Sequence, residues 1–290
     1  MPELPEVETV ARGLRRLIVG KNIVKVSHDN AKSFPNSLVE VNNFMVGANI
    51  GGVRRRAKVI IIDLDDSWSL VAHLKMTGQM VYRGEENWGA GHPNDDFLAE
   101  LPVRATRVQI EFSDGSKLFF NDQRKFGWMK LLPTAEIKNM PFFIKVGPEP
   151  LEDSFTLENF IDRFKRKKRS AIKAALLDQS VIAGVGNIYA DESLWRAQIH
   201  PETRVESLDS SEFKRLYEAV RYVMNLSIEK GGSTARNYVN ADGGKGNYLD
   251  YANVFRKEGS LCARCGSEII KTRVAGRGTH ICPVCQKVKA

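Results

Sequence analysis

Short hydrophobic stretches occupy much of positions 20–132, some of them, such as residues 22–28, alternating with polar residues, and turn-forming residues separate them. This period of two is typical of β-strands that bury one face. We therefore predict a β-sandwich or barrel for residues 1–132, preceded by one helix that buries the face containing Leu4, Val7 and Leu14. The predicted strands cover residues 22–28, 59–64, 68–73, 107–112, 117–121 and 127–132. Residues 84–102 are predicted to form a long surface loop.

The period changes to that of a helix after about residue 155. Helices are predicted from Leu157, with Thr156 as the N-cap, and from Asn187 after a turn with two glycines. Two more are predicted over 171–178 and about 210–229, the second opened by a capping arrangement at 209–212. We expect domains at 1–132, 151–250 and 251–290, with a proline-containing linker at 133–150 and a glycine-rich loop at 231–250.

Composition narrows the class of protein. The 290 residues are 42% hydrophobic and 27% charged, and no hydrophobic run approaches the ~20 residues that span a bilayer. We expect a soluble, cytoplasmic protein. The net charge of +8 is concentrated in residues 54–58, residues 163–173 and the stretch from Arg256 onward. Three separate basic blocks favour a polyanionic partner, most commonly nucleic acid.

All four cysteines lie near the C-terminus, as Cys262-x-x-Cys265 and Cys282-x-x-Cys285. This spacing is typical of a tetrahedral zinc site, and four protein ligands leave no open position, so the zinc is expected to be structural. Two disulfides or a redox pair are the alternatives. The lack of a secretory signal argues against disulfides.

The first residues carry candidate chemistry. A Met-Pro start normally loses its methionine, which leaves Pro2 with a free secondary amine that titrates near pH ~8. Such an amine can attack a sugar carbon and form an iminium. Glu3 and Glu6 could supply and accept protons beside it. The alternative is an ordinary helix start, in which Pro5 and the acidic residues only favour the first turn.

Several ordered motifs resemble bacterial formamidopyrimidine-DNA glycosylase, a repair enzyme that removes oxidised purines. The motifs are Pro2-Glu-Leu-Pro-Glu-Val-Glu-Thr9, Arg55-Arg-Ala-Lys58, His73-Leu-Lys-Met-Thr-Gly78, Asp122-Gln-Arg-Lys-Phe-Gly127, Gly147-Pro-Glu-Pro150, Ile182-Ala-Gly-Val-Gly-Asn-Ile-Tyr189, Ile199-His-Pro201 and the terminal cysteine pairs. The resemblance implies an α+β fold: an N-terminal β-sandwich with flanking helices, then a helix–two-turn–helix domain with a zinc-ribbon finger. It also implies one structural zinc, a partner of damaged double-stranded DNA, and a monomer.

The resemblance assigns roles to single residues. Pro2 would attack C1′ of the damaged nucleoside, Glu3 would be the general acid, and Glu6 would support the base site. Beta- and delta-elimination at the abasic site would follow. Lys58 and Arg277 would complete the catalytic site. Together with Asn187, a DNA-binding residue, they would bind the phosphates around the extruded nucleotide. Met76, Arg124 and Phe126 would fill the gap left by the extruded nucleotide. Arg104 and Lys173, from basic stretches, are expected to contact DNA.

The chain departs from the family pattern in places. The usual Lys-His-Asp-His-Val run reads Arg104-Ala-Thr-Arg-Val108, the usual Val-Tyr-Gly-Arg run reads Val254-Phe-Arg-Lys257, and the loop at 240–250, which in the family covers the flipped base, has its own sequence. The alternatives are an endonuclease VIII-like enzyme acting on oxidised pyrimidines, a catalytically silent DNA-lesion-binding protein and a zinc-ribbon RNA binder.

Overall fold

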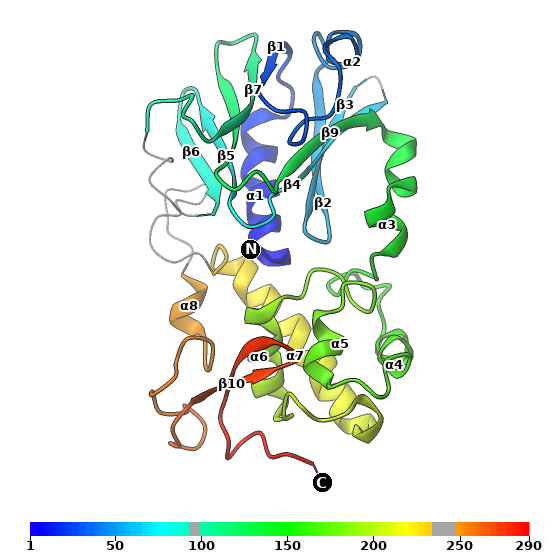
Figure 1. Cartoon of the computed structure of the whole chain (residues 1–290), viewed down its shortest axis with the longest axis vertical. Coiled ribbons are helices and arrows are strands. Elements are labelled where there is room, and N and C mark those ends of the chain that lie inside the picture. Colours follow the sequence, from blue (N-terminus) through cyan, green and yellow to red (C-terminus); the bar gives the residue numbers. More distant parts are fainter. Residues whose placement is uncertain (66, 93–98, 234–246, 290) are drawn as a thin grey trace. The chain divides into compact units, whose positions relative to one another are not determined.

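The computed structural model describes residues 1–65, 67–92, 99–233 and 247–289 (Figure 1). The chain divides into two compact units. The first consists of Met1–Ile144 with Lys230–Asn247, and the second of Lys145–Glu229 with Tyr248–Ala290. The division after Ile144 falls inside the predicted linker. Residues 230–247 belong to the first unit, although the sequence assigned them to the helical domain.

The first unit is a β-sandwich. Its sheets have the strand orders β1-β7-β8-β5-β6 and β2-β3-β4-β9, and all the neighbouring strands are antiparallel. The strands are β1 (Ile23–His28), β2 (Ile50–Arg56), β3 (Val59–Leu64), β4 (Trp68–His73), β5 (Gly78–Arg83), β6 (Asn87–Gly91), β7 (Thr106–Phe112), β8 (Lys117–Asp122) and β9 (Trp128–Pro133). The helices are α1 (Leu4–Ile18), α2 (Leu38–Phe44), α3 (Pro141–Lys145) and a 3-10 helix at Thr134–Asn139. The predicted sandwich is confirmed.

Helix α1 is part of the sandwich core because its hydrophobic face is buried against residues of both sheets. Val7, Val10 and Leu14 belong to the same buried cluster as Ile60 of β3 and Phe120 of β8. A side chain at Gly13 would collide with the ring of Trp88, since its Cβ would lie 2.3 Å from Cζ2. The absence of a side chain there lets helix and strand approach closely. This packing fixes the helix whose first residues carry the candidate chemistry.

The prediction of a surface loop over 84–102 is wrong for its first part. Residues 87–91 form β6, which pairs with β5, and Trp88 is buried in the core. The glycines of this segment concealed the strand, because glycine disfavours strands where no neighbouring strand compensates. Residues 93–98 lie outside the part of the chain that the structure describes.

The second unit is helical, with one hairpin. It contains α4 (Leu157–Lys165), α5 (Ile172–Leu177), α6 (Asn187–Ala197), a 3-10 helix at Val205–Ser207, α7 (Ser210–Glu229), α8 (Tyr248–Tyr251), β10 (Ile270–Val274) and β11 (Arg277–Ile281). The predicted caps are present. Thr156 accepts a hydrogen bond from the Asn159 N–H, and Asp209 and Glu212 form a reciprocal capping box. These caps explain why α4 and α7 begin where the sequence predicted.

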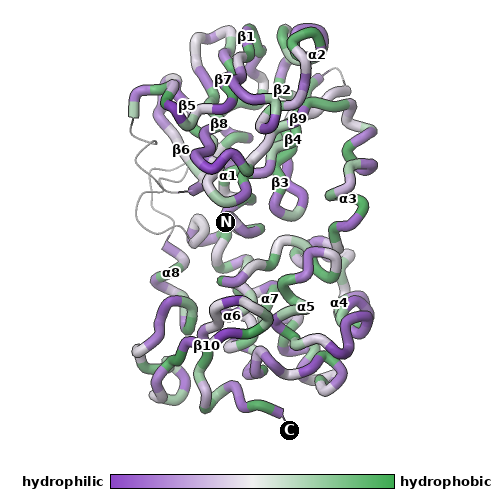
Figure 2. Tube along the Cα trace, in the orientation of Figure 1, coloured by the Kyte–Doolittle hydropathy of each residue, from purple (hydrophilic) through white to green (hydrophobic). Residues whose placement is uncertain are grey.

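Hydrophilic residues interrupt the hydrophobic stretches throughout the trace in Figure 2. Among the residues that the structure describes, no helix is both long enough and apolar enough to cross a membrane.

Candidate active site and nucleic-acid interface

The start of α1 brings three candidate residues together. Pro2 is buried, and Glu3 is the N-cap residue of the helix. The Glu3 N–H donates to the Glu6 carboxylate at 2.9 Å in a capping box. The helix N-terminus, with its positive end of the dipole, favours carboxylates at this place. The helix-start interpretation is therefore correct, and the same geometry holds Pro2 beside two buried carboxylates.

Glu6 also connects α1 to residues far away in the chain. Its other carboxylate oxygen accepts the Ser233 N–H at 2.8 Å, and Gly232 packs against its side chain with a φ of +90°. The contact anchors the first described residues of the predicted glycine-rich loop to the helix start. Residues 234–246, which include most of the expected lesion-covering loop, lie outside the described residues.

Lys58 projects from the turn between β2 and β3, and is only 4% exposed. Arg55 holds this turn by donating to Glu8 of α1 at 2.8 Å and to the Ala57 carbonyl at 3.1 Å. Burial alone would raise the pKa of Glu8, but its hydrogen bond and ion pair with Arg55, and those with Arg12, lower it on balance. The partly buried pair places the turn against α1, and Lys58 itself is buried there, so it is not a freely solvated cation.

Met76, Arg124 and Phe126 lie on two turns at the ends of adjacent strands. Met76 is 39% and Phe126 48% exposed, so neither belongs to the core. The Arg124 guanidinium lies 4.8 Å from the centre of the Phe126 ring. Both turns contain a lysine in the left-handed region, Lys75 at φ +51° and Lys125 at φ +56°. Exposed hydrophobic residues beside a stacked guanidinium suit insertion between bases.

His73 supports the Met76 turn, because its Nδ1 accepts the Lys75 N–H at 3.0 Å. Burial lowers the pKa of His73 to about 3, and the charges of Lys75 and Lys58 add to the effect. The ring is therefore neutral at physiological pH, as an acceptor at Nδ1 requires.

Arg104 lines an open cavity of about 620 Å³ in the first unit, together with Gln123, Lys125 and the buried Arg107. Arg107 is already paired with Asp29. Arg104 and Lys125 are exposed and carry the remaining positive charge of the cavity wall. The departure from the family's histidine run thus places an arginine, which is charged at every physiological pH, beside the Arg124 turn.

Asn187 is the first residue of α6, as predicted, and Gly186 is the N-cap. The side chain of Gln179 shapes the preceding turn by accepting the Gly184 N–H at 2.9 Å and donating to the Val185 carbonyl at 2.7 Å. The Asn187 side chain donates to the Gly278 carbonyl at 2.9 Å. This bond joins the start of α6 to the β10–β11 hairpin, whose exposed Arg277 opens β11.

The prediction that Lys173 contacts DNA is wrong. Lys173 and Asp191 are both fully buried, and their charged atoms lie 2.6 Å apart. The Lys173 ammonium also donates to the Gly278 carbonyl at 3.0 Å and to the Thr279 hydroxyl at 2.7 Å. Because buried charges must be paired and hydrogen-bonded, this lysine is committed to the protein interior. It fastens the hairpin that carries Arg277 to α5 and α6.

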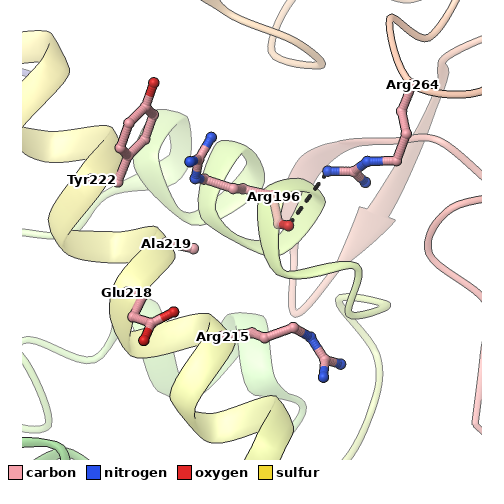
Figure 3. A pocket seen from close by; sticks show the side chains of 6 residues that line it. All are labelled: Arg196, Arg215, Glu218, Ala219, Tyr222 and Arg264. Carbon is pink, nitrogen blue, oxygen red and sulfur yellow. Dashed lines mark hydrogen bonds between the residues drawn. The ribbon is translucent and has the colours of Figure 1, made fainter.

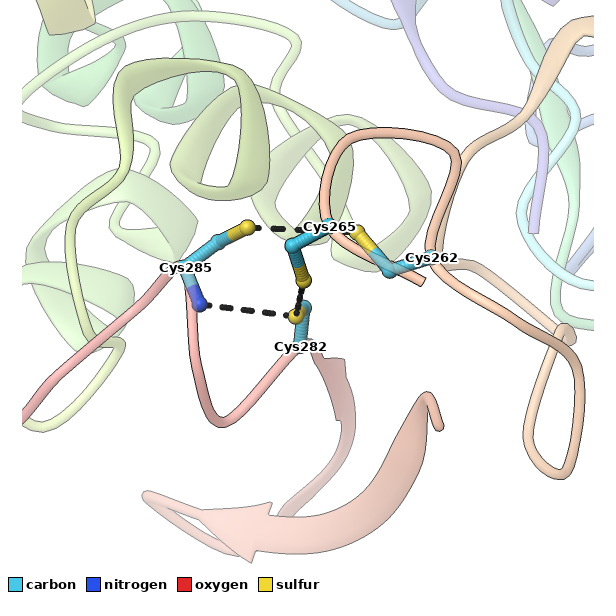
Figure 4. Close-up of side chains that lie close together, drawn as sticks. All are labelled: Cys262, Cys265, Cys282 and Cys285. Carbon is cyan, nitrogen blue, oxygen red and sulfur yellow. Dashed lines mark hydrogen bonds between the residues drawn. The ribbon is translucent and has the colours of Figure 1, made fainter. Parts of the chain in front are cut away.

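The four cysteine sulfur atoms lie within 4.8 Å of one another (Figure 4). Their Sγ separations include 3.9 Å for Cys262–Cys285 and 3.4 Å for Cys265–Cys282, and no cysteine is in a disulfide. Zinc–sulfur bonds of about 2.3 Å in a tetrahedron place the sulfurs about 3.8 Å apart. The cluster therefore fits one structural zinc ion, as predicted. The Trp195 indole donates to the Cys262 sulfur at 3.4 Å and links the finger to α6.

A cavity of about 490 Å³ at the C-terminal end of α6 is lined by three arginines (Figure 3). Arg264 donates to the Trp195 carbonyl at 3.0 Å, Arg215 donates to the Ala197 carbonyl at 3.1 Å, and Arg196 stacks on Tyr222. Arg264 and Arg215 thus satisfy carbonyls of the helix end. Glu218, Ala219 and Tyr222 of α7 complete the lining of this cavity.

Comparisons with known proteins agree with this geometry. Three family models match the chain. The model of the formamidopyrimidine-DNA glycosylase N-terminal domain matches residues 1–129, that of the formamidopyrimidine-DNA glycosylase H2TH domain matches residues 146–239, and that of the zinc finger found in FPG and IleRS matches residues 259–288. The formamidopyrimidine-DNA glycosylase of Enterococcus faecalis is 42% identical over 290 residues, which are 100% of this chain and 98% of that protein. The chain belongs to the formamidopyrimidine-DNA glycosylase family.

Solved structures of this family match over nearly the whole chain. Lactococcus lactis Fpg in complex with abasic-site DNA has a TM-score of 0.85 at 34% identity, and covers 98% of this chain and 99% of its own. The wild-type Lactococcus lactis protein in complex with DNA containing N7-benzyl-Fapy-dG has a TM-score of 0.85 at 35% identity. The match covers 99% of this chain and 100% of that one. The fold class, the zinc and the DNA glycosylase and abasic-site lyase class predicted from the sequence are confirmed.

Sequence reasoning missed several residues that hold the candidate residues of each unit in place. Ser233 and Asp191 had no local signal, because each acts through a partner distant in sequence. Glu8 stood inside the first motif, but its partner Arg55 lies 47 positions away. Asp122 stood inside a recognised motif, but only its neighbours Arg124 and Phe126 received a role.

Proposed function

We propose that this glycosylase excises oxidised purines from duplex DNA with the amino group of Pro2 as the nucleophile. The observation that carries the proposal is the placement of Pro2 at the buried start of α1, beside the reciprocal Glu3–Glu6 capping box. After removal of Met1, the secondary amine has an appreciable neutral fraction, since such groups titrate near pH ~8. Glu3 is directly next to Pro2 in the sequence, and both Glu3 and Glu6 are buried.

The chemistry follows from the amine. The Pro2 nitrogen bonds to C1′ as the bond between C1′ and the oxidised base breaks, and the proton that the amine loses passes to the departing base. Glu3 then donates a proton to the ring oxygen O4′ as the sugar ring opens. The resulting iminium at C1′ acidifies the C2′ hydrogen. Loss of that proton expels the 3′ phosphate, and a second elimination expels the 5′ phosphate. Water finally releases Pro2 from the sugar fragment. Glu6 supports the base site through its contact with Ser233.

The remaining residues hold the DNA. Lys58, Asn187 and Arg277 are proposed to bind phosphates around the extruded nucleotide, and Arg104 a phosphate near the Arg124 turn. Extrusion costs a few kcal/mol of stacking, which Met76, Arg124 and Phe126 partly restore by filling the gap. The exposure of the two hydrophobic residues and the arginine–phenylalanine stack support this role.

A substrate comparison tests the proposal. Single-turnover excision is measured on duplexes that carry 8-oxoguanine opposite cytosine or thymine glycol, with wild type and Glu3→Gln. We expect faster excision of 8-oxoguanine, and a loss of excision in Glu3→Gln. Preference for thymine glycol would favour the endonuclease VIII-like alternative. Duplex binding without cleavage of either lesion, or of an abasic site, would favour a silent lesion binder.

We propose the cytoplasm, where thiols are kept reduced, as the compartment of this activity, because the four cysteines converge as thiols within 4.8 Å of one another.

A further inference from the structure

Asp122 ends β8 and is fully buried between the two turns that carry Met76 and Arg124. One of its carboxylate oxygens accepts the Thr77 hydroxyl and the Arg124 N–H, the latter at 3.3 Å. The other oxygen accepts the Gly127 N–H at 2.6 Å. A single carboxylate therefore bonds to the residue after Met76, to Arg124 itself and to the residue after Phe126.

The two turns are also bonded directly to each other. The Arg124 N–H lies 3.1 Å from the Thr77 hydroxyl oxygen, so it is shared between Thr77 and Asp122. The backbone of Asp122 is fixed as well, because its N–H donates to the Ala105 carbonyl at 2.8 Å and its carbonyl accepts from buried Arg107 at 3.0 Å. Neither turn can shift without breaking bonds to this one side chain.

The site requires an acceptor without a hydrogen to donate. All three groups around the carboxylate are donors, and an ionised carboxylate has about four acceptor positions. An asparagine would have the same shape but would direct an NH₂ group at a neighbouring donor. A side chain at Gly127 would press on the carboxylate too, since its Cβ would lie 3.1 Å from the Asp122 Oδ2. This position therefore requires both the shape and the acceptor oxygens of an aspartate carboxylate.

We propose that Asp122 is a positioning residue that presents Met76, Arg124 and Phe126 as one rigid unit for insertion into the duplex. The proposal rests on the wedge role given to these three side chains under the proposed function. Without the carboxylate, each turn would sample other conformations. Insertion would then carry the entropic cost of ordering both turns. Asp122 touches no reacting atom, so the chemistry at Pro2 is not affected.

The test uses Asp122→Asn with Asp114→Asn as the matched control. The Asp114 carboxylate also accepts a backbone N–H, from Ser116 at 2.9 Å, but it lies in the turn at the opposite end of β8. Insertion is followed with 2-aminopurine placed next to the base opposite an abasic-site analogue. Chemistry is followed by single-turnover excision from an 8-oxoguanine duplex, and by cleavage of a single-stranded abasic oligonucleotide, which leaves no gap to fill.

Asp122→Asn is expected to lose most of the 2-aminopurine signal and to slow duplex excision about ten- to a hundredfold, as expected for lost hydrogen bonds to a charged group. Single-strand cleavage and the Asp114→Asn variant stay at wild-type levels. Thr77→Val, a milder change, lowers duplex excision less, and its effect is not additive with that of Asp122→Asn. This variant keeps the test available if Asp122→Asn folds poorly.

Two results would overturn the inference. Equal losses on duplex and single strand in both Asp122→Asn and Thr77→Val would indicate a general structural role. A wild-type 2-aminopurine signal in both variants would show that the turns need no such anchor. If the wild-type protein itself gave no signal, while it still excised the lesion, the wedge assignment would fail together with this inference.

Discussion

Lys173→Met is predicted to destabilise the second unit. This change leaves Asp191 buried without its ammonium partner. Removing one member of a buried ion pair typically costs about 3–5 kcal/mol. The matched control is Lys167→Met in the same basic segment. Lys167 pairs with Asp178 at 2.8 Å, but the two side chains are 41% and 32% exposed. An exposed pair of this kind contributes at most about 1 kcal/mol.

Hydrogen exchange of the α6 amides measures this difference, since it reports the stability of the second unit separately from that of the first. For amides that exchange through unfolding of the unit, 3–5 kcal/mol corresponds to exchange about two to four powers of ten faster. Lys173→Met should reach that range. Lys167→Met should stay within about tenfold of wild type.

The salt dependence of DNA affinity tests the opposite possibility, that Lys173 contacts DNA. If Lys173 were a phosphate contact, Lys173→Met would lower the slope of log affinity against log salt by about 0.9. Its amide protection would match that of wild type. That pair of results would refute the assignment of Lys173 to the interior.

Three further predictions concern the metal, pH and packing. Cys265→Ser should lose zinc in a metal-to-protein assay, together with the protection of the β10–β11 hairpin; a hairpin that stays protected without metal would contradict a structural role. The pKa of His73 is about 3 in the folded state, below its unfolded value near 6.5. The neutral ring therefore contributes fully to the free energy of unfolding above pH ~6.5, and this contribution falls by about 1.4 kcal/mol per pH unit as the pH drops toward 3. In His73→Phe, the free energy of unfolding measured with urea should lack this decrease between pH 6.5 and 3. A decrease equal to that of wild type would contradict a buried, neutral His73. Gly127→Ala would bring a Cβ within 2.8 Å of Phe120 and should cost about 1–3 kcal/mol in thermal unfolding. Gly52→Ala, with open space around it, is the control, and equal costs would contradict the crowding argument.

Local signals predicted much of the fold. Thr156 and the capping residues at 209–212 predicted where α4 and α7 begin to within one or two positions, because a cap bonds to a residue only three positions away in the sequence. The turn with two glycines predicted the start of α6 at Asn187, and the spacing of the two cysteine pairs predicted the zinc cluster. Strand β6 was missed, because its pairing with β5 and the burial of Trp88 are tertiary effects that override the poor strand propensity of its glycines.

The candidate site was harder to predict from the sequence. Charge could not distinguish Lys173, which is buried, from its neighbours in the basic block, because only tertiary structure supplies Asp191. The contact between Glu6 and Ser233 joins residues 227 positions apart, and no local pattern indicates it. The motif around Asp122 drew attention to the side chains that face outward. The buried carboxylate that orients them became visible only from its hydrogen bonds.

The central claim is that Pro2 forms the covalent bond to DNA. The most direct measurement is borohydride trapping on an 8-oxoguanine duplex, followed by tryptic digestion and mass spectrometry of the adduct. We predict that the trapped sugar is found on the peptide from Pro2 to Arg12, with Met1 absent. An adduct on a lysine-containing peptide, such as one that includes Lys58, would contradict the claim. Efficient trapping by a protein that retains Met1 would contradict it as well.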